Sequence, residues 1–309
     1  MSANRRDFLK LMGAVGVGNL LGTESADASA PERSSDDWLG MLTDLTLCIG
    51  CRKCEWACND VNGLPNRPLE VFDDQSVFER QRRTDAEHFT VVNRHIPGEP
   101  GAKPVYVKVQ CMHCNEPACA SACLVAAFRK TRTGQVVYNE NVCIGCRYCM
   151  VACPFSIPAY TYDKAFAPVV RKCTMCFDKV AERHEVPACA KICPVEAITF
   201  GKRRDLLALA RERMQHESAR YVNHIYGEHE VGGTCWMYIA GRPFEQLGFR
   251  TTLGTTPAPD LTSTFLSAVP LVLTLWPALL MGAYAFTRHR DELAQTGEAE
   301  NAPTTREEG

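Results

Sequence analysis

The sequence predicts an α+β protein made of two similar modules, followed by one membrane-spanning helix near the C-terminus. Three observations lead to this fold class. Sixteen of the seventeen cysteines fall into four groups of four. Short helix and strand patterns recur after the cysteine groups, which indicates an internal repeat. Residues 261–287 contain no charged side chain, which predicts a single apolar helix.

The cysteine groups have the spacing of metal-binding loops. The first and third are C-x2-C-x2-C-x3-C, the second is C-x2-C-x4-C-x3-C, and the fourth is C-x2-C-x12-C-x3-C. Three closely spaced thiolates can bind three corners of a [4Fe–4S] cube, and the fourth cysteine then ligates the neighbouring cluster. Four groups therefore predict four [4Fe–4S] clusters in two pairs. The groups are Cys48, Cys51, Cys54, Cys58; Cys111, Cys114, Cys119, Cys123; Cys143, Cys146, Cys149, Cys153; and Cys173, Cys176, Cys189, Cys193.

Two other uses of cysteine remain as alternatives. Disulfides are common in exported proteins, but this chain is long enough to form an ordinary core without them. Structural zinc could use the C-x2-C pairs, yet it closes with four ligands and needs no third cysteine three residues on. The sequence has no C-x2-C-H motif, which excludes covalent c-type haem. Cys235 stands outside the groups and is predicted to be a small buried side chain.

The N-terminal segment has the order of an export signal. Arg5 and Arg6 lie in a basic stretch, an apolar Gly-rich stretch follows, and Ala-Ser-Ala at residues 28–30 resembles a cleavage site. The twin arginine marks a route for folded proteins. Clusters must be built on reduced thiols, which the cytosol provides before export. We therefore predict a twin-arginine signal peptide at residues 1–30.

The uncharged stretch near the C-terminus is long enough to cross a membrane. Its apolar core, residues 265–286, would span the hydrocarbon layer of roughly 30 Å as a helix. Arg288 and Arg290 follow at once, so the positive-inside rule places the tail (288–309) in the cytoplasm. We predict a transmembrane helix at 261–287 in the inner membrane, with the cluster domain on the periplasmic face. A buried helix of a soluble domain is the alternative.

The pattern between the second and third cysteine groups is that of a bacterial two-cluster ferredoxin. A helical turn, a strand, a Gly-containing turn and a second strand at 136–138 lead from one group to the next. This resemblance assigns residues 101–162 to one ferredoxin-like module. Residues 194–201 repeat the helix-then-strand pattern after the fourth group, so the first and fourth groups are predicted to form a second module.

The other segments are divided by composition. Residues 31–100 hold the first group and a polar, Pro-rich excursion, which predicts a docking surface or a solvated loop. Residues 163–220 hold the fourth group and an amphipathic covering helix at 205–220. Residues 221–260 include a strand-like stretch and are predicted to dock on a membrane partner.

No pattern in the chain indicates a substrate site. The formal net charge of −2 is mixed along the chain and gives no nucleic-acid footprint. The sequence contains no Gly-rich phosphate loop, flavin fingerprint or nucleophile motif. The chain is therefore predicted to carry electrons and to leave bond breaking to a partner. His113, between two cluster ligands, is predicted to form a hydrogen bond or tune a cluster potential.

The four groups, in this order and with these insertions, resemble the four-cluster iron–sulfur subunits of membrane oxidoreductases. That family includes the electron-transfer subunits of dimethyl sulfoxide reductase and formate dehydrogenase-N. The resemblance runs from Leu42 to about Phe244. The Cys-Met-His-Cys stretch at 111–114 and the run at 143–154 are closest to the iron–sulfur subunit of the uptake [NiFe] hydrogenase-2.

The resemblance implies that paired groups exchange their fourth cysteine. It also implies that all four clusters are cubanes, because every one of the sixteen cysteines is present. The implied ligand sets are Cys48, Cys51, Cys54, Cys193 (cluster A); Cys173, Cys176, Cys189, Cys58 (cluster B); Cys111, Cys114, Cys119, Cys153 (cluster C); and Cys143, Cys146, Cys149, Cys123 (cluster D).

The predicted function is electron transfer within a membrane-bound periplasmic oxidoreductase. The partners would be a catalytic subunit, hydrogenase-2-like in the first instance, and an integral membrane subunit that binds quinone or haem. Formate dehydrogenase or another molybdopterin oxidoreductase is the alternative complex. A zinc- or disulfide-stabilised scaffold without redox function is the alternative of a different class.

Overall fold

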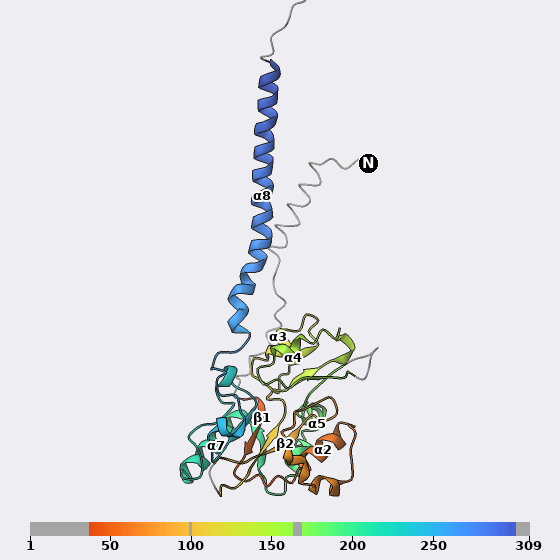
Figure 1. The fold of residues 1–309 in the computed structure, drawn as a ribbon, viewed down its shortest axis with the longest axis vertical. Helices are drawn as coiled ribbons and strands as arrows, with labels where there is room; N and C mark the ends of the chain where they lie inside the picture. Colours follow the sequence, from red (N-terminus) through yellow and green to blue (C-terminus); the bar gives the residue numbers. More distant parts are fainter. Residues whose placement is uncertain (1–36, 99–100, 163–168, 301–309) are drawn as a thin grey trace, which may run out of the picture. The chain divides into compact units, whose positions relative to one another are not determined.

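The computed structural model describes residues 37–98, 101–162 and 169–300. The predicted signal segment lies outside these residues. The described chain mixes short helices with small sheets, in agreement with the predicted mixed fold class (Figure 1). Its apolar core includes several of the cysteines themselves.

A three-stranded sheet joins segments from distant parts of the chain. Its middle strand, β1 (Leu39–Asp44), pairs antiparallel with β8 (Ile198–Lys202) and parallel with β9 (Trp236–Ile239). The register places Gly40 opposite Gly201. The segment before the first cysteine group therefore meets the segments that follow the fourth group.

Both faces of this sheet are buried. Met41 and Trp236 lie in the larger core cluster, which also contains cysteines of the second and fourth groups. Leu42 faces the other way, into a smaller cluster with Leu206 of α7 (Arg203–His216). The predicted covering helix is thus present, and it packs on β1 and β8. It ends four residues earlier than the pattern predicts.

Short helices lie within or after the cysteine groups. The structure has α2 (Lys53–Val61), α3 (Ala118–Ser121), α4 (Tyr148–Ala152), α5 (Phe177–Arg183) and α6 (Ala188–Lys191). Helix α3 packs against α4, so the second and third groups lie together (Figure 1). Helix α2 packs against α6, which brings the first group to the fourth across more than a hundred residues of sequence.

Two-stranded ladders accompany these helices. Strands β4 (Phe128–Lys130) and β5 (Val136–Tyr138) form the hairpin that the sequence pattern predicts. Strands β6 (Ala159–Tyr160) and β7 (Val170–Arg171) form another short antiparallel pair. The remaining 3₁₀ turns in this part of the chain are η4 (Glu140–Val142), η5 (Glu230–Gly232) and η6 (Phe244–Leu247).

The polar excursion after the first group is folded onto the domain. It contains two 3₁₀ turns, η2 (Leu69–Asp73) and η3 (Ser76–Glu79), and strand β2 (Val91–His95), which pairs antiparallel with β3 (Val105–Val109). Phe72 and Phe78 are buried within the turns. The sequence predicted a docking surface or a solvated loop here, and these aromatic residues gave little sign of burial because they are few and widely spaced among polar ones.

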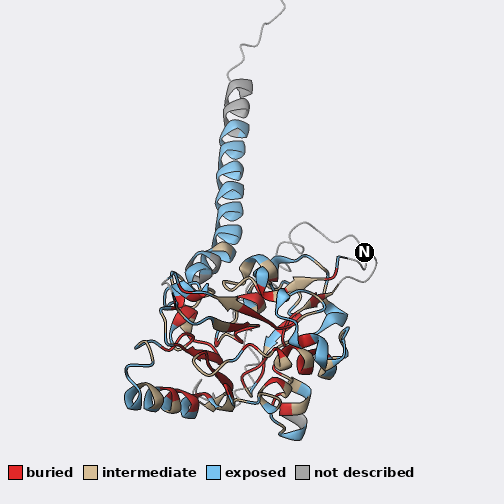
Figure 2. Ribbon diagram, turned by 60° about the horizontal axis from the view of Figure 1, so that its bottom comes forward, coloured by how far each residue is buried: buried red, intermediate tan, exposed pale blue. Residues whose placement is uncertain are grey.

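The C-terminal helix is long and apolar. Helix α8 (Asp260–Glu300) continues through Pro270 and Pro277. Its 33-residue stretch from Asp260 to Glu292 is long and apolar enough to cross a membrane, and the apolar part is not buried by the rest of the chain. Figure 2 colours most of this helix as exposed, whereas strands β1 and β9 are buried along nearly their whole length.

Candidate iron–sulfur cluster sites

All four cysteine groups share one backbone turn. The residue just before the second cysteine has a positive φ in each group: 73° at Gly50, 50° at His113, 70° at Gly145 and 54° at Met175. Glycine adopts this left-handed conformation without the steric cost that other residues incur. The same turn therefore recurs in all four groups although only two of them use glycine, and the sequence repeat is a repeat of structure.

This turn aims backbone N–H groups at cysteine sulfurs. The amide of Met175 donates to Cys173 Sγ at 3.3 Å, and the amide of Gly145 donates to Cys143 Sγ at 3.4 Å. The amide of Ala127, after the second group, donates to Cys123 Sγ at 3.1 Å. Hydrogen bonds to the sulfurs are one of the means by which a protein sets cluster potentials. The loops thus carry donors suited to cluster ligands.

The fourth cysteine of one group lies beside the first three of another. Cys193 is close enough to Cys48 to raise the pKa of its thiol by charge repulsion, in addition to the larger effect of burial. One cavity is lined by these two residues together with Cys51 and Cys54. These four cysteines are the set expected for cluster A.

A second cavity has the same character. It is lined by Cys111, Cys114, Cys119 and Cys153, the set expected for cluster C. After burial, neighbouring Cys111 and Cys153 are the largest contributions that raise the pKa of the Cys114 thiol. Two of the expected ligand sets therefore each surround a space bounded by their own sulfurs.

The other two sets are brought together as well. The thiol of Cys58 interacts electrostatically with those of Cys173, Cys189 and Cys176, which are the remaining cysteines of set B. The thiol of Cys149 interacts in the same way with those of its three partners in set D, which are Cys143, Cys146 and Cys123. Cys146 is the exposed member of the sixteen, so set D is open to solvent on one side.

Burial makes several of these thiols weaker acids than an exposed cysteine. It raises the pKa of Cys48 and of Cys173 to about 11, and that of Cys119 to about 12. The protonated thiol is uncharged and loses less on leaving water. A cluster binds the thiolate form, so its loading must release protons from these groups.

The cysteines are free and are spread around cavities rather than gathered at a point. All seventeen lie in the described chain, and none forms a disulfide. Within the described residues, no three side chains of His, Cys, Asp or Glu gather closely enough to hold a single metal ion.

Two buried lysines, Lys108 and Lys172, and one half-buried lysine, Lys130, stand among the cysteine groups. Lys108 Nζ donates to Thr90 Oγ1 at 2.7 Å and to Gln110 Oε1 at 3.0 Å. Lys130 Nζ donates to the carbonyl oxygen of Cys114 at 2.7 Å. Lys172 Nζ donates to the carbonyl oxygen of Cys173 at 3.1 Å. Burial alone would lower the pKa of Lys108, but the nearby cysteines raise it overall.

His113 is buried between the ligands of the second group. Its Nδ1 accepts a hydrogen bond from the amide of Val136 at 3.0 Å, so the proton of the neutral ring lies on Nε2. Burial lowers the pKa of this histidine well below its usual value, and Lys172 and Lys130 lower it further. The predicted hydrogen bond is therefore present, with the ring in the neutral form.

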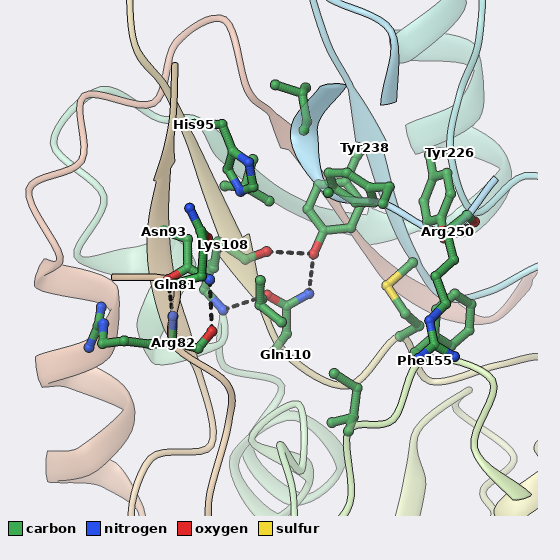
Figure 3. A pocket seen from close by; sticks show the side chains of 17 residues that line it. Gln81, Arg82, Asn93, His95, Lys108, Gln110, Phe155, Tyr226, Tyr238 and Arg250 are labelled. Carbon is green, nitrogen blue, oxygen red and sulfur yellow. Dashed lines mark hydrogen bonds between the residues drawn. The ribbon is translucent and has the colours of Figure 1, made fainter. Parts of the chain in front are cut away.

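One cavity apart from the cysteine groups measures about 320 Å³ (Figure 3). Aromatic side chains, including Phe155, Tyr226 and Tyr238, line one part of it. The hydroxyl of Tyr238 donates to the carbonyl oxygen of Lys108 and accepts from Gln110 Nε2, as the dashed lines in Figure 3 mark. The hydroxyl of Tyr238, the carbonyl of Lys108 and the side-chain amide of Gln110 are thus hydrogen-bonded to one another.

Comparison with known proteins identifies the family. The family model described as "4Fe-4S dicluster domain" matches residues 102–203. The chain is 37% identical over 203 residues to the nitrate-inducible formate dehydrogenase iron-sulfur subunit of Escherichia coli K12, which covers 64% of this chain and 66% of that subunit. It is 34% identical over 275 residues to hydrogenase-2 operon protein HybA of Escherichia coli O157:H7. The match covers 79% of this chain and 83% of that protein. The chain belongs to the family of iron–sulfur electron-transfer subunits of oxidoreductases.

A relative from another organism matches over nearly the whole chain. A protein of Nitratidesulfovibrio vulgaris is 50% identical over 300 residues, which are 96% of this chain and 80% of that protein. The predicted resemblance to the iron–sulfur subunit family is thus confirmed. Iron–sulfur clusters and an electron-transfer role in an oxidoreductase follow from membership of this family.

The sequence pattern revealed the cysteines of this chain but not the lysines that lie among them. Lys172 stands next to Cys173 in the sequence, which was the one available signal. Lys108 and Lys130 lie on strands β3 and β4, where lysine usually faces solvent. Their burial depends on tertiary packing that no local pattern encodes.

Proposed function

We propose that the chain is a four-cluster electron relay. The observation that carries the proposal is the position of each group's fourth cysteine beside the first three cysteines of its partner group. When bound, each [4Fe–4S] cluster supplies a centre that gains or loses one electron. The chain's own contribution is to hold sixteen thiolates, donate amide hydrogen bonds to several of them, and surround most of them with protein. The ligands would be sets A to D as predicted from the sequence.

The relay would be organised as two ferredoxin-like modules. The packing of α3 on α4 supports one module, residues 101–162, that binds clusters C and D. The packing of α2 on α6 supports a second, built from the first cysteine group within 31–100 and the fourth group within 163–220, that binds clusters A and B. Residues 221–260 would still contribute to docking, although β9 within them is buried in the sheet.

The partners of this relay would be a catalytic subunit and a quinone- or haem-binding membrane subunit. Similarity to hydrogenase-2 operon protein HybA favours a hydrogenase-2-like catalytic partner. Similarity to a formate dehydrogenase iron-sulfur subunit favours a molybdopterin enzyme as the second candidate. Purification of the detergent-solubilised complex, followed by mass spectrometry of the co-purifying chains, separates the two.

The cluster domain would lie on the periplasmic face of the inner membrane. The twin arginine of residues 5 and 6, the apolar stretch within α8, and the arginines at 288 and 290 support this topology. Replacing Arg5 and Arg6 by lysine should leave a folded, cluster-loaded precursor in the cytoplasm. Normal membrane activity of that variant would contradict the predicted signal or show that a partner carries the subunit across.

The decisive experiment measures both the iron and sulfide content of the protein and the pairing of its cysteine ligands. Anaerobically purified protein should contain about sixteen iron atoms and as many labile sulfides per chain. Zinc without sulfide would instead support the scaffold alternative. Cys58→Ser should then alter the cluster held by Cys173, Cys176 and Cys189, because Cys58 would complete set B. A change confined to the cluster of Cys48, Cys51 and Cys54 would contradict the exchange of ligands.

A further inference from the structure

The two buried lysines occupy the junctions between cysteine sets. The side chain of Lys108 lines the cavity of set A and also interacts electrostatically with Cys58, Cys173 and Cys189 of set B. It is nearly inaccessible to solvent, with 2% of its surface exposed. Its ammonium group lies 4.5 Å from the centre of the Trp236 ring. Lys108 therefore stands between sets A and B.

Lys172 occupies the next junction. Its side chain lines the cavity of set C and interacts electrostatically with Cys119 of that set. The following residue in the chain is Cys173, a member of set B, whose thiol also interacts with that of Cys111 in set C. Lys172 is 5% exposed. One peptide bond thus separates a residue at the set C cavity from a ligand of set B.

Both ammonium groups are held by uncharged oxygen atoms. Lys108 donates to a hydroxyl and a side-chain amide, and Lys172 donates to the carbonyl oxygens of Val136 and Cys173, at 2.5 and 3.1 Å. These hydrogen-bond partners do not neutralise the two ammonium groups. The positive charges of Lys108 and Lys172 therefore act on the neighbouring cysteine sets. A fixed cation in a poorly solvated site stabilises a neighbouring group more when that group gains an electron.

We propose that Lys108 and Lys172 set the reduction potentials at the two inner junctions of the relay, Lys108 for clusters A and B and Lys172 for cluster C. They are positioning residues that act on the clusters through charge. This inference rests on the proposed four-cluster relay. The charges raise the potentials of the clusters beside them, on both sides of the crossing between the two modules: A and B on one side and C on the other.

The test replaces each lysine by glutamine, which keeps N–H donors and removes the charge. Potentiometric titration followed by electron paramagnetic resonance, on the full-length cluster-loaded protein, gives the midpoint potential of each cluster. Lys172→Gln should lower the equilibrium constant for reduction of cluster C at least tenfold, which is 59 mV for a one-electron couple. Lys108→Gln should lower those of A and B, and neither variant should move D.

The matched control is Lys191→Gln. Lys191 lies between Cys189 and Cys193 in the sequence but is exposed, so water screens its charge and no midpoint should move. Lys172→Arg restores the charge and should restore the potential. The signal of cluster C is assigned beforehand from its alteration in Cys153→Ser.

Three results would overturn the inference: unchanged midpoints in both glutamine variants, equal shifts of all four clusters, or loss of cluster C in Lys172→Gln with its retention in Lys172→Arg. The last would show that the charge serves cluster binding. Iron and sulfide analysis of the unmodified protein separates this failure from failure of the relay itself. A chain with about sixteen of each but unmoved potentials refutes only the role of the lysines.

Discussion

Glu55 joins three segments through one buried carboxylate. It lies on α2 between a cluster-set cysteine and Trp56, and its side chain is 1% exposed. Its Oε1 accepts from the amide of Val92 at 2.6 Å, and the carboxylate pairs with Arg82 at 2.5 Å and Arg52 at 3.1 Å. These bonds tie the first cysteine group to strand β2. The excursion after that group is thereby fixed onto the domain.

We expect Glu55→Gln to destabilise the protein by roughly 3 kcal/mol, because two arginines then lose a buried counter-charge. The measurement is the denaturant midpoint of the cluster-loaded protein, followed anaerobically by loss of cluster absorption. Glu217→Gln is the matched control, since its pair with Arg220 is exposed and should contribute less than about 1 kcal/mol. Equal midpoints for the two variants would contradict this account of Glu55.

His95 should make stability depend on pH. Burial at the end of β2 lowers its pKa below the usual 6.5. The unfolded chain then binds a proton near pH 6.5 that the folded chain resists, so the stabilisation is fully present above pH 6.5 and is lost as the pH falls below it. His95→Gln should reduce that loss in thermal melts between pH 7 and 5. In the control His88→Gln, at an exposed site, the loss due to His95 should persist.

The cysteine ligands of the site were predictable from their spacing, but the lysines that lie among them were not. Cysteine spacing encodes ligand loops because the distances along the chain are short and local. Cys235 was expected to be buried, and it is, with Lys130 Nζ at 3.3 Å from its sulfur. The position of Lys108 could not be predicted, because its partners Thr90 and Trp236 come from different segments and meet only in the folded core.

At the scale of elements, two glycines that face each other across β1 and β8 differ in what surrounds them. A Cβ atom on Gly40 would lie 2.6 Å from the carbonyl oxygen of Cys235, a backbone atom that cannot move aside. A Cβ on Gly201 would meet only the Leu206 side chain, at 3.7 Å, which is an ordinary contact. The close approach of strands β1 and β9 therefore depends on the missing side chain of Gly40.

Gly40→Ala should destabilise the protein by about 1 to 3 kcal/mol, the range for an overpacked core, because β1 and β9 must separate. Gly201→Ala, its cross-strand partner, should be nearly neutral. Denaturant midpoints of the two variants, measured side by side, check the difference. The explanation fails if the two substitutions have the same effect.

Helices and hairpins were predicted where periodicity or turn residues are local. The hairpin of β4 and β5 and the covering helix α7 appear at or near their predicted positions. The position of β1 in the sheet was missed, because a strand buried on both faces has no alternation of apolar and polar residues. The strand at 236–239 was expected, but its burial beside β1 was not, since pairing between strands so far apart leaves no local trace.

At the scale of the whole molecule, removal of α8 should release a soluble relay. A chain ending at residue 259 keeps every cysteine and all three strands of the central sheet. It should leave the membrane fraction and retain the same iron content, whereas the full chain should resist carbonate extraction. Iron analysis and fractionation of the two chains check this. A full-length chain that fractionates as soluble would exclude a membrane role for the helix.

The sheet that joins residues near 40, 200 and 236 constrains the order in which the protein can mature. The thiols at 111–153 are complete soon after they leave the ribosome, whereas Cys48 must wait for residue 193, and β1 must wait longer still for β9. Contacts between remote segments form slowly. Clusters C and D, whose proposed ligands are contiguous in the sequence, should consequently be inserted first. Until synthesis is nearly finished, the earliest thiols of the nascent chain remain without their partner group and open to oxidation.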